Sequence, residues 1–98
     1  MITRYEMWRF SSGKEVDMPE LLHNIGYNLK ALVGVAHGVV TTDLIISNGK
    51  SSHDIMIVST FDNEKEMLSF EEDGAYEVFA AVYLEPYFNN RSVLDVEK

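Results

Sequence analysis

The most regular hydrophobic pattern lies in the middle of the chain, at residues 52–61. In the segment IMIVSTF at residues 55–61, successive side chains of an extended chain point to opposite sides, and both sides are apolar at their centre. This pattern predicts a strand that is buried on both faces. A helix is possible for so short a run, but the β-branched residues and the upstream Asn48-Gly49 turn favour a strand. Something must therefore cover the sheet on each side.

Residues 2–10 predict a first strand with one unusual face. That face combines two charged and two aromatic side chains, namely Arg4, Glu6, Trp8 and Phe10. Two interpretations stay open at this stage. The face is either solvated, with its aromatic residues partly exposed, or it forms a polar pair inside a mostly apolar pocket.

Capping signals and hydrophobic spacing predict a helix that follows this strand. Asp17 is suited to the N-cap, Pro19 to the first turn and Glu20 to the capping-box position. The helix is expected to run to about residue 32 and to end at Gly34. Its apolar face is expected to carry Leu22, Ile25, Leu29 and Leu32.

The rest of the chain predicts two further strands and two helices around the central strand. Residues 35–47 are expected to form a strand that returns through Asn48-Gly49, in a loop widened by residues 50 and 51. Asp62 or Asn63 is expected to cap a helix that breaks at Gly74. A further helix carries an aromatic stripe that begins at Tyr76, and residues 92–96 predict a last strand.

The predicted order β-α-β-β-α-α-β is the ferredoxin-like pattern of the α+β class. Right-handed crossovers would place the helices on one face of a four-stranded antiparallel sheet, with the first and third strands as central neighbours. We expect a single domain over residues 1–98. The face away from the helices is expected to carry Trp8, Phe10, Ile55 and Ile57. Because such a face is too apolar to leave in water, a sheet-to-sheet homodimer is the simplest cover.

Composition and charge narrow the possible partners. The net charge of −8 over 98 residues argues against binding to nucleic acid or to an anionic membrane surface. Cysteine is absent from the sequence, which excludes disulfides and thiolate chemistry. The first ten residues contain charges that interrupt any signal-peptide core, and no apolar run approaches a membrane span. A soluble, cytoplasmic protein is expected.

The second half of the chain resembles the stress-responsive dimeric α/β-barrel (Dabb) family. The resemblance is carried by His53-Asp54, by STFD at 59–62, by YLEP at 83–86 and by RSVLDVE at 91–97. It implies a ferredoxin-like fold and a dimer in which two sheets close a barrel. Most members of the family have no assigned activity.

A plant member of that family is a polyketide cyclase, and its histidines are not matched here. Tyr76 stands where the catalytic histidine would be, Arg4 where the first-strand histidine would be, and Ile55 where the central-strand histidine would be. No catalytic residue is therefore predicted. The alternative is a cofactor-free enzyme on the same fold, resembling the cyclase or the antibiotic-biosynthesis monooxygenases. For that alternative, His37 is the one histidine that could reach the interior.

The favoured hypothesis is a homodimer that binds a small, mostly apolar ligand in the barrel or between sheet and helices. Arg4 would contact a ligand carboxylate or enolate, and Glu6 would orient Arg4 or a ligand hydroxyl. Trp8 and Ile57 would supply apolar walls, and Tyr76 would donate a hydrogen bond. No cofactor is predicted. No metal site is predicted either, because a Glu-x-x-His pair such as 20–23 occurs only once.

Overall fold

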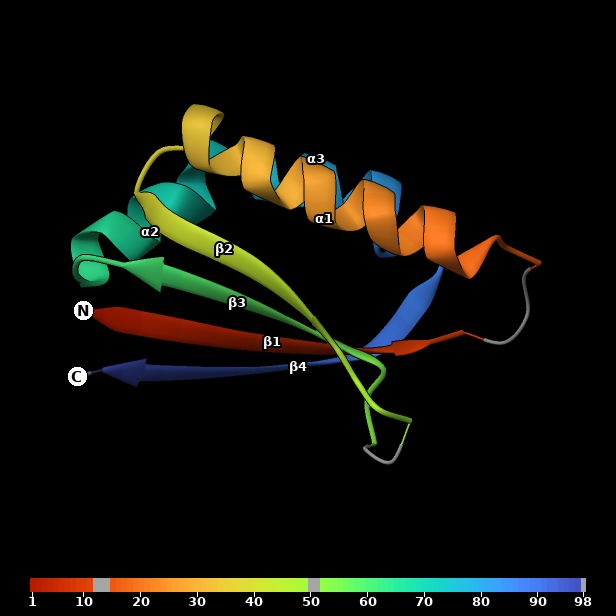
Figure 1. Ribbon diagram of the computed structural model, residues 1–98. Helices are drawn as coiled ribbons and strands as arrows, with labels where there is room; N and C mark the ends of the chain where they lie inside the picture. The colour runs from red at the N-terminus through yellow and green to blue at the C-terminus, as the bar shows by residue number, and fades with distance from the viewer. Residues whose placement is uncertain (12–14, 50–51, 98) are drawn as a thin grey trace.

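The computed structural model describes residues 1–11, 15–49 and 52–97, and it confirms the ferredoxin-like order (Figure 1). The chain runs through β1 (Ile2–Phe10), α1 (Met18–Val35), β2 (Val39–Ile46), β3 (Ile55–Phe61), α2 (Glu64–Asp73), α3 (Ala75–Tyr83) and β4 (Phe88–Glu97). The four strands form one sheet in the order β2-β3-β1-β4, and every neighbouring pair is antiparallel. As predicted, β1 and β3 are the central strands.

All three helices lie on the same side of the sheet, and the opposite face is bare (Figure 1). This is the arrangement that two right-handed β-α-β crossovers are expected to produce. No helix in the described part of the chain is long and apolar enough to span a membrane.

The predicted helix caps are confirmed. The side chain of Asp17 accepts a hydrogen bond from the backbone N–H of Glu20 at 3.2 Å, and Asn63 accepts one from Glu66 at 2.9 Å. Asn63, not Asp62, is therefore the cap of α2. Gly74 separates α2 from α3 with a φ of 82°, a left-handed conformation that glycine adopts without steric cost.

Several predicted boundaries were wrong. Helix α1 does not end at Gly34 but continues to Val35, where the N–H of Ala36 still bonds to the carbonyl of Leu32. The glycine that turns the chain is Gly38, whose φ is 93°. Strand β2 therefore begins at residue 39 instead of 35, while β4 already begins at 88 instead of 92. The expected loop residues 50 and 51 lie outside the described part of the chain.

The prediction of which sheet face is open was also wrong. Trp8, Ile55 and Ile57 are buried beneath the helices, and Phe10 packs there against Phe88. The helix-facing side of the sheet is thus the one that carries Arg4 and Glu6. Partners elsewhere in the fold satisfy those charges, so this face can be buried beneath the helices of the same chain.

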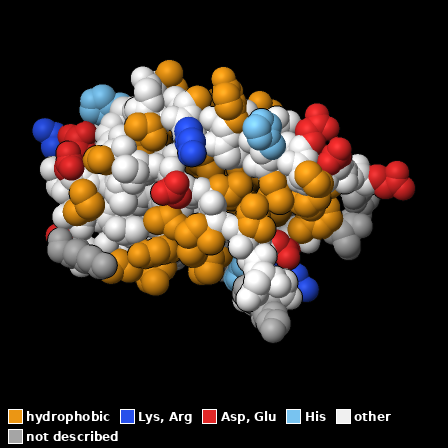
Figure 2. Space-filling view, viewed as in Figure 1, with side chains coloured by type: hydrophobic (Ala, Val, Ile, Leu, Met, Phe, Trp, Pro, Cys, Tyr) orange, Lys and Arg blue, Asp and Glu red, His pale blue; other side chains and the backbone are white. Residues whose placement is uncertain are grey.

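The open face carries the alternate residues of the same strands. Cross-strand partners place Tyr5 beside Val58 and Leu94, with Met7 beside Met56 and Ile45 next in the row. Leu94 is 58% exposed and Ile45 is 47% exposed. In Figure 2, hydrophobic side chains gather along the lower side of the molecule, away from the helices. An apolar face therefore remains uncovered, but its residues differ from those expected.

Candidate functional site

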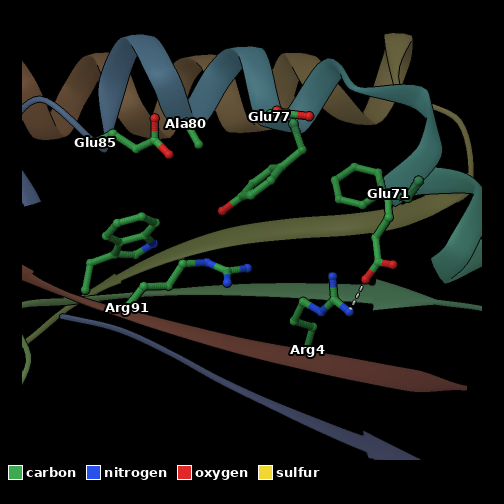
Figure 3. Close-up of a pocket in the computed structure, with 9 residues that line it drawn as sticks. Arg4, Glu71, Glu77, Ala80, Glu85 and Arg91 are labelled. Atoms are coloured by element: carbon green, nitrogen blue, oxygen red, sulfur yellow. Dashed lines mark hydrogen bonds and ion pairs between the residues drawn. The ribbon is translucent and has the colours of Figure 1, made fainter. Parts of the chain in front are cut away.

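A cavity of about 340 Å³ lies between the sheet and helices α2 and α3 (Figure 3). Four elements, β1, α2, α3 and β4, and the segment after α3 line it. Its wall consists of Arg4, Trp8, Phe70, Glu71, Tyr76, Glu77, Ala80, Glu85 and Arg91. Aromatic rings and charged groups therefore face the same space. The volume is at the small end of the range for ligand pockets.

Glu6 anchors the wall of this cavity from behind. Its carboxylate is 2% exposed, and it accepts hydrogen bonds from Trp8 Nε1–H at 2.8 Å and from the hydroxyl of Tyr76. Arg91 donates two more, from Nε at 3.1 Å and from Nη2 at 2.8 Å. Four donors saturate the acceptor capacity of Glu6. A carboxylate held in this way positions its neighbours and has no free lone pair to offer a substrate.

Arg4 joins β1 to β4 and α2. Its Nε and Nη2 bond to Asp95 at 2.8 and 3.1 Å, and Nη2 also bonds to Glu71 at 2.6 Å. Figure 3 shows the Glu71 carboxylate pointing down from its helix to Arg4. The hydrogen bond from Arg4 lowers the pKa of Asp95, and the one to Asp95 raises the pKa of Arg4 above its ordinary value. Arg4 is therefore charged at any working pH, and two carboxylates, those of Asp95 and Glu71, compensate its charge.

Tyr76 begins the aromatic stripe of α3 and turns its hydroxyl to the sheet. Its ring stacks obliquely between Phe70 and Phe79, with centroids 5.5 and 5.6 Å away. Burial raises the pKa of the Tyr76 hydroxyl strongly, and the negative charge of Glu6 raises it further. The hydroxyl is therefore protonated at neutral pH, and its single proton is donated to Glu6. Only the oxygen lone pairs are left for a ligand.

The predicted site residues divide into three groups. Arg4, Trp8 and Tyr76 line the cavity. Glu6 lies behind the wall, where it bonds to Trp8 and Tyr76 but not to Arg4. Ile57 is Glu6's partner on β3 and is buried in the core.

Three charged residues of the network were missed from the sequence: Glu71, Arg91 and Asp95. The signal for Asp95 was cross-strand pairing, because the β1–β4 register places it directly opposite Arg4. Arg91 lies two positions before the partner of Glu6, on the same face of β4. Glu71 had no comparable signal, since a helix position facing a strand is set by tertiary packing.

The histidines do not reach the cavity. His37 is exposed, and its backbone N–H bonds to Asp73 at 2.6 Å. His23 is exposed on α1. His53 is partly buried, and its ring nitrogens lie within hydrogen-bond distance of the Ser52 hydroxyl and the carbonyl of Asn90. Among the described residues, no group of three or more histidine and carboxylate side chains is arranged to hold a metal ion.

Comparison with known proteins supports the fold, through solved structures and not through sequence. No family model matches the sequence, and no curated protein matches it. Among solved structures, a dimeric ferredoxin-like protein of unknown function from Bacteroides fragilis superimposes with a TM-score of 0.83. It is 13% identical, and the match covers 99% of this chain and 95% of that one.

Two other solved structures bear on function. A Dabb family protein from Mesorhizobium loti superimposes with a TM-score of 0.76 at 10% identity. The match covers 99% of this chain and 95% of that one. The heme-degrading MhuD of Mycobacterium tuberculosis, with two hemes bound, has a TM-score of 0.70 at 16% identity. That match covers 100% of this chain and 95% of MhuD. The chain thus shares its fold with a Dabb protein, as the resemblance implied, and this fold also supports an enzyme.

Proposed function

We propose that the protein is a homodimer of the Dabb type that binds a small, mostly apolar ligand in the cavity between sheet and helices. The cavity carries this proposal. Trp8, Phe70, Tyr76 and Ala80 give it an apolar wall, and charged groups are placed around the wall. Small-molecule sites typically combine such a wall with a few polar groups. A cytoplasmic location stays a prediction from the sequence.

The homodimer is proposed to form through the open sheet face. Support comes from the exposed apolar residues of this face, which include Leu94 and Ile45, and from the Bacteroides fragilis neighbour, which is dimeric. Two copies packed face to face would cover these residues on both copies. The ligand cavity lies on the other side of the sheet, so each copy would keep its own cavity.

The enzyme alternative is less well supported. His37, the base that this alternative needed, is exposed and away from the cavity. Tyr76 keeps its proton at neutral pH, and Glu6 is saturated by donors, so neither can serve as a general base. The heme-degrading neighbour shares the fold alone, and fold does not determine chemistry. Binding without catalysis is therefore the better account of these residues.

Blocking the cavity tests the proposal. Ala80 is buried and lines the cavity, whereas Ala81 is exposed on the same helix. We expect fragments of a small-molecule library to shift the NMR signal of the Trp8 indole N–H in the wild-type protein. Ala80→Leu should abolish these shifts, and Ala81→Leu should retain them. The proposal fails if no fragment shifts the signal, or if Ala80→Leu binds as the wild type does.

A further inference from the structure

The hydrogen-bonding groups that remain free in the cavity indicate the chemical class of its ligand. The only N–H of the Trp8 side chain donates a hydrogen bond to Glu6, and the only O–H of Tyr76 donates one to the same carboxylate. These two aromatic residues therefore offer the ligand a ring face and oxygen lone pairs. A ring face and lone pairs attract a positive or hydrogen-donating group.

The charges around the cavity also favour a positively charged ligand. Arg4 and Arg91 face five carboxylates on the wall or bonded to it, so the net charge is −3 when all are ionised. Glu6, Glu71 and Asp95 are engaged by the two arginines. In the described part of the chain, Glu77 and Glu85 have no cationic partner. The uncompensated charge of the cavity wall is therefore negative.

The placement of these groups separates two ends of the cavity. In Figure 3, Arg4 and Glu71 lie at one end, and Glu85 lies near the other, beneath the end of α3. Arg4 and Arg91 each keep an Nη1 amino group that makes no hydrogen bond within the described residues. An anion that approached them would also approach the carboxylates that hold them, which lowers its affinity.

We propose that the ligand is an organic amine with an aromatic or cyclic apolar body. This rests on the proposed function, since it names the class of ligand for the same cavity. The apolar body packs against Trp8 and Tyr76, and the ammonium group is held by Glu85 and by the free lone pairs of the Tyr76 hydroxyl. The assignment replaces the expectation that Arg4 binds a ligand carboxylate, because Arg4 is already occupied by Asp95 and Glu71.

Three probes with the same ring test this assignment: 2-phenylethylamine, 2-phenylethanol and phenylacetate. Their binding is followed by the fluorescence of Trp8, which is the single tryptophan of the sequence. We expect the amine to bind at least about tenfold more tightly than the carboxylate, with the alcohol between them. Added salt should narrow the difference between the two charged probes.

Two variants with the same change of charge locate the effect. Glu85→Gln should weaken amine binding about threefold or more and leave the alcohol unchanged. Glu72→Gln, at an exposed position of α2 outside the cavity wall, should leave both unchanged. If the alcohol or the carboxylate binds as tightly as the amine, or if both variants act alike, the amine assignment is overturned and the binding cavity stands. If no probe binds at millimolar concentration, both the assignment and the proposed function fail.

Discussion

Replacing Tyr76 by phenylalanine tests the hydrogen-bond network behind the cavity. The substitution removes one of the four donors to Glu6 and keeps the ring between Phe70 and Phe79. A hydrogen bond to a charged group contributes about 1.5–3 kcal/mol. Because three donors remain on Glu6, we expect Tyr76→Phe to lower the free energy of unfolding by about 1–2 kcal/mol near neutral pH.

The difference in unfolding free energy between wild type and Tyr76→Phe should also depend on pH, which tests the Tyr76 hydroxyl specifically. The pKa of Tyr76 is raised in the folded protein, while an unfolded tyrosine ionises at about pH 10. The contribution of the protonated hydroxyl is therefore full below pH 10 and is lost as the pH rises above it. One unit above that pKa, the unfolded state gains about 1.4 kcal/mol by releasing the proton. The difference between wild type and Tyr76→Phe should thus nearly vanish at about pH 11.

Urea unfolding at a fixed protein concentration, followed by Trp8 fluorescence, measures both values. Tyr27→Phe is the matched control, because Tyr27 is 70% exposed. We expect this control to change stability little at either pH. The reasoning is refuted if Tyr76→Phe costs no more than Tyr27→Phe near neutral pH, or if its cost is the same at both pH values.

Three further substitutions test the fold and the proposed interface. Leu94→Asp should weaken the dimer more than about 100-fold, because each copy would bury a charge in the interface. Leu68→Asp on α2 should leave the dimer intact, and light scattering that finds both variants dimeric would exclude this interface. Arg91→Ala should lower the free energy of unfolding by about 2–3 kcal/mol, since a buried carboxylate loses its ion pair with a half-exposed arginine. Denaturant unfolding that finds no loss would contradict the pairing. Gly38→Ala should destabilise the protein more than Gly49→Ala in the same unfolding experiment. Both glycines have positive φ, but only at Gly38 would a Cβ clash with backbone, 2.2 Å from an oxygen of α2, so equal effects would contradict this packing.

Local signals predicted the elements well. The bounds of β1 at residues 2–10, the caps at Asp17 and Asn63 and the break at Gly74 were all correct. Each depends on residues that are close in sequence, where capping geometry and alternation act directly. The end of α1 was misplaced because Gly34 tolerates the helix, and the turn that only glycine fits comes at Gly38.

The inward face of the sheet could not be predicted in the same way. Alternation divides β1 into two faces but does not say which one the helices cover. The sequence left open whether Arg4 and Glu6 lie on a solvated face or inside an apolar pocket, and in the structure Asp95 and Arg91 on β4 compensate both charges. These partners lie far away in the sequence, and only the register of β1 against β4 brings them together. Of the predicted site residues, Arg4, Trp8 and Tyr76 line the cavity, and their role in binding a ligand stays a prediction. The contacts that define the charge of the cavity could not be predicted from the sequence.

Native mass spectrometry of the protein as purified, followed by the same sample under denaturing conditions, tests the central proposal most directly. The account predicts a dimer that carries a small additional mass for each copy, and this mass should disappear on denaturation. The released compound should be an amine with an apolar body. A monomer would contradict the interface through the open sheet face, and a released carboxylate without an amine would contradict the assignment of the ligand.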